Sequence, residues 1–185
     1  MFCKPTHLFC SDASEFGLGE GFNLISGNVW HFELPVHLRL RTTLHALEFL
    51  ACVITIWVDI LYQNIPTESC ILSQMDSSSA AGGLRKSNFF DGDDEIVQMT
   101  TAQHLALLVL QADFCIYSQW FAGDENIVAD SLSHDLHFPH DILKNSVKSS
   151  IPSQVTFSLK ISVLQPEIVS WLTCLLQNLA SKTVR

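Results

Sequence analysis

The chain has 185 residues, enough for one globular domain with an internal hydrophobic core. Hydrophobic residues make up 48% of the sequence and charged residues 16%, a composition that excludes an intrinsically disordered chain. The formal net charge of −9 argues against nucleic-acid binding through a basic face alone, so either the partner is not nucleic acid or some of the acids bind a metal.

Targeting signals are not evident. The longest apolar run, residues 44–62, contains His45, Glu48 and Asp59, which disfavour a membrane span. The first residues lack the apolar core of a signal peptide, so we expect an intracellular protein of the cytoplasm or nucleus. The six cysteines occur singly and mostly in apolar stretches, which favours buried, reduced thiols.

The first third of the chain predicts three strands and a helix. Residues 7–14 are typical of a buried strand, and residues 19–34 predict two strands joined by a turn at Ser26, Gly27 and Asn28. Apolar residues then recur at steps of three and four over residues 43–61, which predicts a largely buried amphipathic helix.

Strands and helices alternate in the next part of the chain. Residues 70–76 and 114–121 predict strands, and residues 77–86, 100–113 and 124–137 predict helices, with a polar loop over residues 89–98. Strands that are first consecutive and then separated by helices indicate an α/β fold, with a mixed five-stranded sheet flanked by helices.

The end of the chain has a different composition. Residues 141–165 are rich in Lys, Ser and Gln and indicate a linker. Residues 166–185 predict an amphipathic helix that is loosely attached to the rest or available to bind a partner. We therefore expect a domain over residues 1–140, a linker over 141–165 and a C-terminal helix over 166–185.

Four acids occupy informative positions. Asp12 and Asp76 lie near the ends of the first and fourth strands, Glu48 lies in the apolar helix, and Asp130 lies in the short helix 124–137. If helix 43–61 is a crossover connection, the two strands are neighbours and their carboxyl ends meet. Clustered carboxylates repel one another, and divalent cations with oxygen ligands are the usual compensation. Simpler roles remain open for each acid: a cap for Asp12 or Asp76, a partly exposed helix residue for Glu48, and a helix-dipole partner for Asp130.

Histidines offer further candidates. His134, His137 and His140 recur every three residues, but Pro139 disfavours one regular helix through all three. His134 is also a candidate for a role near a leaving group.

Four segments, in order and spacing, resemble the ribonuclease H domain of retroelement reverse transcriptases, of the DIRS type or related polyproteins. They are "FCSDASEFGLGEGF", "LHALEFLA", "SQMDSSSAAGGLRK" and "FAGDENIVADSLSH", within residues 7–138. The last is the most specific, since it fits the family's G-x-x-N-x-x-A-D-x-L-S motif. The resemblance implies a ribonuclease H-like fold in a piece of a longer polyprotein, with Asp12, Glu48, Asp76 and Asp130 as catalytic and metal-binding carboxylates.

The same resemblance implies a chemistry and partners. Two Mg²⁺ or Mn²⁺ ions about 4 Å apart, bridged by Asp12, would promote hydrolysis of the RNA strand of an RNA/DNA hybrid. The reverse transcriptase domain of the same element would be a further partner. In the final motif, Gly123 would let the chain turn out of the last strand, Asn126 would start or brace the helix, and Asp130 would point back at the metals.

Two other interpretations remain open. The domain could be a catalytically inactive ribonuclease H-like binding or spacer module, which the acidic balance favours and the presence of all four carboxylates opposes. A transposase or integrase nuclease shares the fold, but its third acid is expected to be a Glu on a late helix, where this chain has Asp130.

Overall fold

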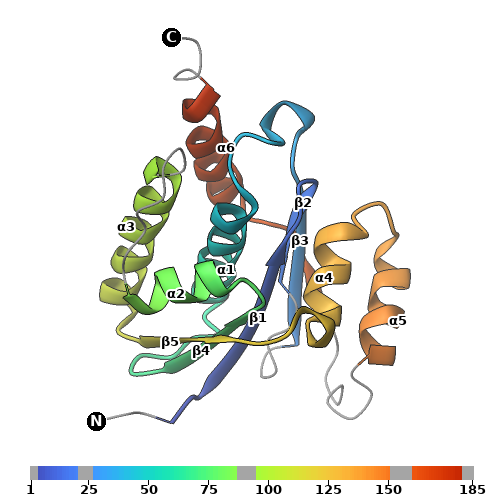
Figure 1. The fold of residues 1–185 in the computed structure, drawn as a ribbon. Coiled ribbons are helices and arrows are strands. Elements are labelled where there is room, and N and C mark those ends of the chain that lie inside the picture. Colours follow the sequence, from blue (N-terminus) through green and yellow to red (C-terminus); the bar gives the residue numbers. More distant parts are fainter. Residues whose placement is uncertain (1–3, 21–26, 87–94, 151–159, 181–185) are drawn as a thin grey trace.

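A computed structural model describes residues 4–20, 27–86, 95–150 and 160–180 of the chain. The described elements, in chain order, are β1 (His7–Ala13), β2 (Gly17–Glu20), β3 (Asn28–Glu33), η1 (Val36–Leu38), α1 (Leu44–Leu61), β4 (Cys70–Met75), α2 (Ser78–Lys86), α3 (Glu95–Ala112), β5 (Cys115–Trp120), η3 (Gly123–Glu125), α4 (Ile127–His134), α5 (His140–Ser150), β6 (Lys160–Ser162) and α6 (Pro166–Ala180). The prediction of an α/β fold with a mixed sheet is confirmed (Figure 1).

The sheet has six strands in the order β5-β4-β1-β2-β3-β6. Strand β2 is antiparallel to both β1 and β3, whereas β4 is parallel to β1, β5 to β4 and β6 to β3. The prediction of five strands is wrong because the sheet also contains the short strand β6, whose Ile161 pairs with Val29 of β3. The crossover from β3 to β4 passes through α1, as the sequence predicts, and places β4 beside β1.

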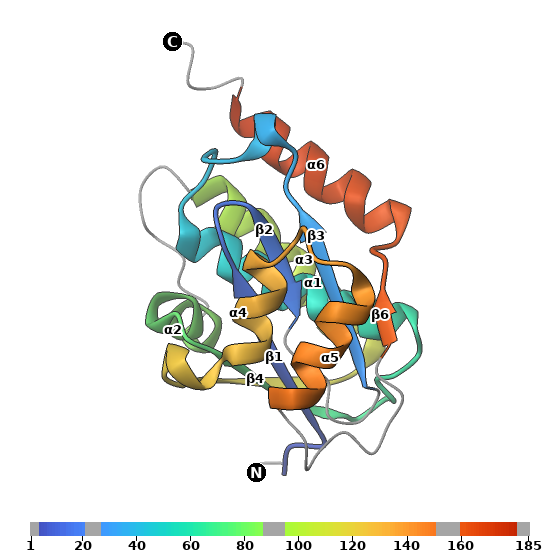
Figure 2. The ribbon, with the colours of Figure 1, turned by 90° about the vertical axis from the view of Figure 1, so that its right-hand side faces the viewer.

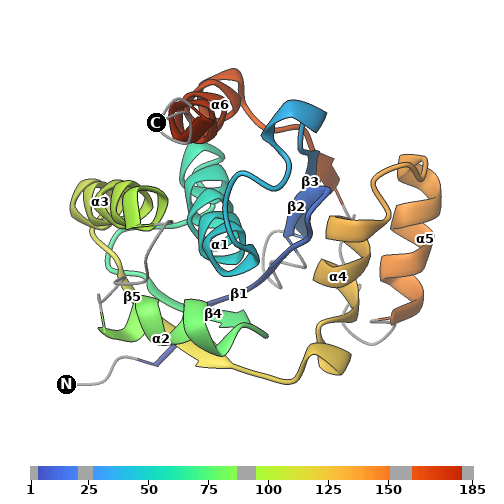
Figure 3. The same cartoon turned by 45° about the horizontal axis from the view of Figure 1, so that its top comes forward.

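Helices cover both faces of the sheet. Figures 1 and 3 show α1, α3 and α6 on one side and α4 and α5 on the other. Helix α1 is buried over most of its circumference and packs on β1, which makes it the central helix of its layer. On the opposite face, Val29 of β3 forms a smaller core with Val128 and Leu132 of α4 and Leu143 of α5.

Some predicted boundaries differ from the structure. Asn28 is the first residue of β3 rather than part of a turn, while Gly27 before it has a φ of 65°, a conformation that glycine adopts without strain. Helix α3 begins at Glu95, inside the predicted polar loop, because an acid in the first helical turn is stabilised by the helix dipole. Residues 89–94 of that loop, and residues 21–25 of the predicted second strand, lie outside the described residues.

The predicted linker is wrong where the chain is described. Residues 141–150 belong to α5 and residues 160–162 form β6, which lies beside β3 (Figure 2). Helix α5 forms because Leu143 is buried against the sheet, and β6 forms because its backbone pairs with β3, contacts that composition does not reveal. Residues 151–159 lie outside the described part of the chain.

Helix α6 is packed, contrary to the prediction of a loosely attached helix. Ile168, Leu172 and Leu176 are fully buried in the main core, which also contains residues of β2, β3 and α1. His104 of α3 lies between two indole rings, with ring centroids 4.2 Å from Trp57 and 4.8 Å from Trp171 of α6. The apolar stripe of α6 is therefore part of the domain core. The predicted end of this helix, residues 181–185, lies outside the described residues.

Two other expectations meet the structure here. By length and composition alone α1 could cross a membrane, but 72% of its apolar window is buried inside the protein, as in a core helix. The expectation of buried, reduced thiols is wrong for Cys70, which is disulfide-bonded, and for Cys115 and Cys174, which are exposed.

Candidate metal centre

Two carboxylates of the site come from neighbouring strands. The last aligned residues of the parallel pair β1 and β4 are Cys10 and Gln74. Asp12, still in β1, and Asp76, just after β4, each lie two residues further along, so they lie at the same end of the two strands and on the same side. This is the neighbourhood predicted from the crossover connection, and the prediction that β1 and β4 are adjacent is confirmed.

The third carboxylate comes from α1. Glu48 lies in the second turn of this helix, and its ligand atom falls within 4.8 Å of those of Asp12 and Asp76. His45, one turn earlier, places Nδ1 3.5 Å from Oε2 of Glu48 and 3.3 Å from Oγ of Ser77. Glu48 therefore lies at the ends of β1 and β4, next to the imidazole of His45.

Asp130 joins the site through Asp12. The structure groups Asp12, Asp130 and His134 as a second set whose ligand atoms lie within 4.8 Å of one another. Asp12 is thus shared by both sets. His134, which the sequence analysis considered for a role near a leaving group, places its Nε2 3.7 Å from Oδ1 of Asp130.

The electrostatics of this arrangement are unfavourable without a cation. Burial, and then the neighbouring Asp76 and Asp130, raise the pKa of Asp12 to about 6. Burial and Asp76 also raise the pKa of Glu48, and burial with Asp130 raises that of Asp76. Two unit charges 4.8 Å apart repel by about 3.5 kcal/mol at an effective dielectric constant near 20. The site therefore gains from any group that brings positive charge.

The carboxylate oxygens also fit a metal ion in their hydrogen bonding. Oδ1 of Asp76 is buried and has no hydrogen-bond partner among the described residues, and Oε2 of Glu48 is buried with the imidazole of His45 only at the long distance of 3.5 Å. Buried polar atoms nearly always have a partner, so these two oxygens are suited to ligate a cation. The donor set is all oxygen apart from the imidazole of His134, which matches the preference of hard divalent cations.

A hydrogen-bonded scaffold fixes Asp12. Ser133 is fully buried in α4, and its Oγ donates to Oδ2 of Asp12 at 2.5 Å. Ser14 donates in turn to the carbonyl of Ser133 at 2.7 Å, and Asn126 donates to the carbonyl of Ser11. These contacts join α4 to β1. The "DSLS" run shows hydroxyl residues at this place, but the Asp12 partner of Ser133 lies more than a hundred residues away, and sequence reasoning missed it.

Two glycines allow close approach at the site. A Cβ on Gly19 of β2 would lie 2.9 Å from backbone atoms of Leu132 and Ser133 in α4. A Cβ on Gly123 would lie 3.1 Å from Oδ2 of Asp76. The motif glycine is therefore explained by its proximity to a carboxylate, whereas the sequence predicts that it lets the chain turn. Asn126 braces the helix through β1, as predicted, although its side chain makes no cap hydrogen bond within α4.

A cavity and an exposed indole lie around the site. A cavity of about 370 Å³ beside Asp12 is lined by Ala13, Ser14, Glu15, Leu40, Thr42, Leu44, Leu47 and His134. On the other side, Trp120 at the end of β5 is 55% exposed and donates its indole N–H to the carbonyl of Asp76 at 2.8 Å. Both surfaces are open to a bound molecule.

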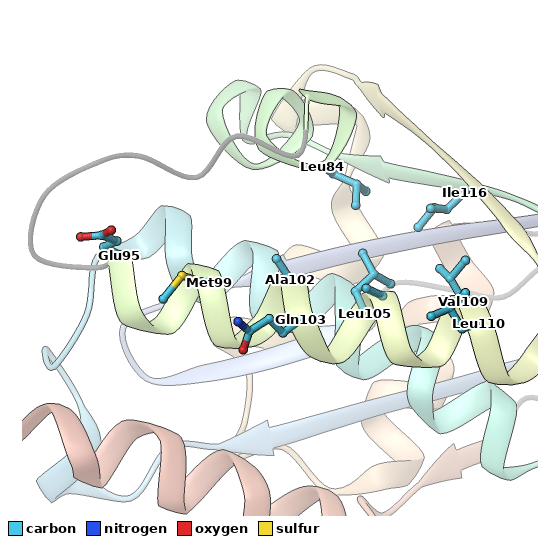
Figure 4. A pocket seen from close by; sticks show the side chains of 10 residues that line it. Leu84, Glu95, Met99, Ala102, Gln103, Leu105, Val109, Leu110 and Ile116 are labelled. Atoms are coloured by element: carbon cyan, nitrogen blue, oxygen red, sulfur yellow. The ribbon is translucent and has the colours of Figure 1, made fainter.

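A second cavity, of about 660 Å³, lies elsewhere, between α2, α3 and β5 (Figure 4). Apolar side chains dominate its lining, with Glu95 and Gln103 as polar exceptions. None of the four carboxylates contributes to it, so it has no part in the metal chemistry considered for the strand ends.

No protein-family model matches this sequence, and a search of curated proteins finds no match. The function of the carboxylate site therefore has to be argued from its geometry and from the motifs in the chain.

Proposed function

We propose that this chain has a ribonuclease H-like fold and hydrolyses the RNA strand of RNA/DNA hybrids with two Mg²⁺ or Mn²⁺ ions. The observation that carries the proposal is the buried carboxylate of Asp12, shared by two sets of ligand atoms that also contain Glu48, Asp76 and Asp130. The strand order and the motifs that resemble retroelement ribonuclease H domains support it.

The four carboxylates divide the work of binding. Asp12 would help to hold both ions because it belongs both to the set with Glu48 and Asp76 and to the set with Asp130. Ser133 holds the Asp12 carboxylate in one orientation by donating to Oδ2, which leaves Oδ1 for ligation. When bound, divalent cations supply the Lewis acidity that activates water and stabilises charge on the scissile phosphate.

His134 is placed to assist proton transfer. It is exposed at the end of α4 and lies beside Asp130, so its imidazole can reach a substrate oxygen while remaining in contact with solvent. The cavity beside it includes Thr42, whose side chain carries a hydroxyl. A hydroxyl there is suited to hydrogen bonding with a ribose 2′-hydroxyl, the group that distinguishes RNA from DNA.

Substrate affinity should be weak and strongly dependent on salt. Ten Lys and Arg residues stand against 19 Asp and Glu, so few phosphates can be neutralised by the protein itself. Bound cations reduce the negative charge at the site, which makes divalent metal a condition for binding as well as for hydrolysis. The reverse transcriptase domain of the same element would supply further contacts.

The test is cleavage of a labelled RNA/DNA hybrid at low salt in Mg²⁺ or Mn²⁺. We expect cleavage of the RNA strand, and no cleavage with Asp76→Asn. Asp124→Asn is the matched control: Asp124 is an exposed acid of η3, close in sequence to Asp130, and belongs to neither ligand set found among the described residues. Equal activity in both variants would contradict the assignment.

Metal binding can be tested without turnover. Mg²⁺ should raise the melting temperature of the wild-type protein, because a ligand of the folded state stabilises it by mass action. Asp76→Asn should abolish the rise and should not destabilise the metal-free protein, since it relieves repulsion. If neither a rise nor cleavage is observed, a binding or spacer module, which the net charge of −9 favours, replaces the enzyme.

A further inference from the structure

A pair of histidines joins β3 to α5 on the face of the sheet that carries α4. Successive side chains of a strand alternate between faces, so His31 lies on the same face as Val29. His140 and Leu143 are three residues apart on α5 and lie on one side of that helix. Val29 and Leu143 belong to one buried cluster, and the two imidazoles meet beside it. The pair is therefore held by packed, regular elements.

The separation of the two rings is informative. Nε2 of His31 lies 3.4 Å from Nε2 of His140, longer than the usual range of about 2.7–3.2 Å for a hydrogen bond from N–H. Two imidazole nitrogens that bind one tetrahedral Zn²⁺ at about 2.0–2.1 Å lie about 3.3 Å apart. The observed distance is thus suited to two ligands of one ion, with little movement of either ring.

The nitrogens are also accessible and in the required form. His140 is exposed at the start of α5, so an ion can reach the pair from solvent. Nδ1 of His31 is buried and has no hydrogen-bond partner among the described residues, which leaves Nε2 as the nitrogen that makes the polar contact of this ring. Burial and the neighbouring His140 lower the pKa of His31, which favours the neutral imidazole that ligates metals.

We propose that His31 and His140 form a second metal site, which binds a divalent transition metal such as Zn²⁺ and fastens α5 to the sheet. The ion takes two imidazole nitrogens from the protein and completes its coordination with water. The donors are nitrogens, whereas the set of Asp12, Glu48 and Asp76 offers oxygens, so the two sites prefer different cations. The proposal does not depend on the hydrolysis proposed above.

Zinc binding at this pair should stabilise the fold. An ion bound across β3 and α5 stabilises the folded state alone, because the two histidines are 109 residues apart in the chain. At zinc concentrations about 100 times the dissociation constant, the melting temperature should rise by roughly 5–10 °C.

The experiment measures melting temperatures of the full chain with and without zinc for the wild type, His31→Gln, His140→Gln and His137→Gln. We expect the zinc-dependent rise to be lost in the first two variants and kept in His137→Gln, an exposed neighbour of Pro139. Asp76→Asn should also keep the rise, because it alters only the carboxylate site. Absence of a rise in the wild type, or an equal rise in all variants, would overturn the proposal.

A direct measurement guards against variants that fold poorly. Imidazole nitrogen NMR spectra of the wild-type protein should show zinc-dependent shifts of the Nε2 signals of His31 and His140. Shifts confined to His134, which belongs to the set with Asp12 and Asp130, would place zinc at the carboxylates and reject the second site.

Discussion

Helix α6 offers a test of the fold that does not depend on function. Leu172 lies in the middle of this helix with an exposed fraction of 0%, in the core that also contains Trp30 and Ile54. Leu172→Ala removes a buried isobutyl group and leaves a cavity that the surrounding core can fill only in part. Such changes reduce the free energy of unfolding by about 2–5 kcal/mol. A mid-range loss of about 3 kcal/mol corresponds to a fall in melting temperature of roughly 6–12 °C for a chain of this size.

The matched control is the same substitution on a different helix. Leu110 of α3 is 78% exposed, so Leu110→Ala should change the free energy of unfolding by no more than about 0.5 kcal/mol. Urea denaturation followed by circular dichroism measures both variants against the wild type. If Leu172→Ala is as mild as Leu110→Ala, then α6 is not part of the core and the description of a single packed domain is refuted.

Three further predictions concern the carboxylate site. Asp12 has a folded-state pKa of about 6 against an ordinary value of 3.8, so the metal-free folded protein binds more protons than the unfolded chain in this window and loses stability as pH rises through it. In the presence of EDTA, Asp12→Asn should remove this loss and raise the free energy of unfolding near pH 7 by up to about 3 kcal/mol, with a smaller gain near pH 4. A gain over the wild type that does not grow with pH would contradict the assignment. Ser133→Ala removes the hydroxyl donor that lowers the pKa of Asp12, so hydrolysis should fall by about 10–100-fold and the acidic limb of the pH–rate profile should move to higher pH. The control Ser131→Ala, which removes a hydroxyl that bonds Asp135, should leave both the rate and the profile unchanged. Gly19→Ala should destabilise the protein and reduce Mg²⁺ binding, because the added Cβ would clash with the backbone of α4. The control Gly82→Ala lies in α2, where the added Cβ has no neighbour within 4 Å, and should raise the free energy of unfolding in urea by about 0.5–1 kcal/mol.

The parts of the fold that the sequence predicts are those with local signals. Helix α1 has apolar residues at steps of three and four, and it is observed at residues 44–61, one residue from the predicted start. The meeting of Asp12 and Asp76 follows from a crossover rule applied to strands that were visible as short apolar runs.

The parts that the sequence misses depend on distant contacts. Strand β6 has three residues, and what makes them a strand is their pairing with β3, more than 130 residues earlier. Helix α5 is polar apart from a few residues such as Leu143, so its composition indicates a linker. The hydrogen bond from Ser133 to Asp12 and the contact of His31 with His140 also join residues far apart in the chain. The neighbouring residues in the sequence give no indication of these partners.

The position of β6 has a consequence for shortened forms of this protein. Without β6, strand β3 would present its backbone N–H and C=O groups along an open edge, a surface that pairs readily with another chain. A chain ended before residue 160 would therefore be at risk of self-association through β3, in addition to any loss of stability from removing α6. The three residues of β6 pair with Asn28, Val29 and Trp30 and cover this part of the edge, so a fragment intended to stay monomeric should extend beyond them.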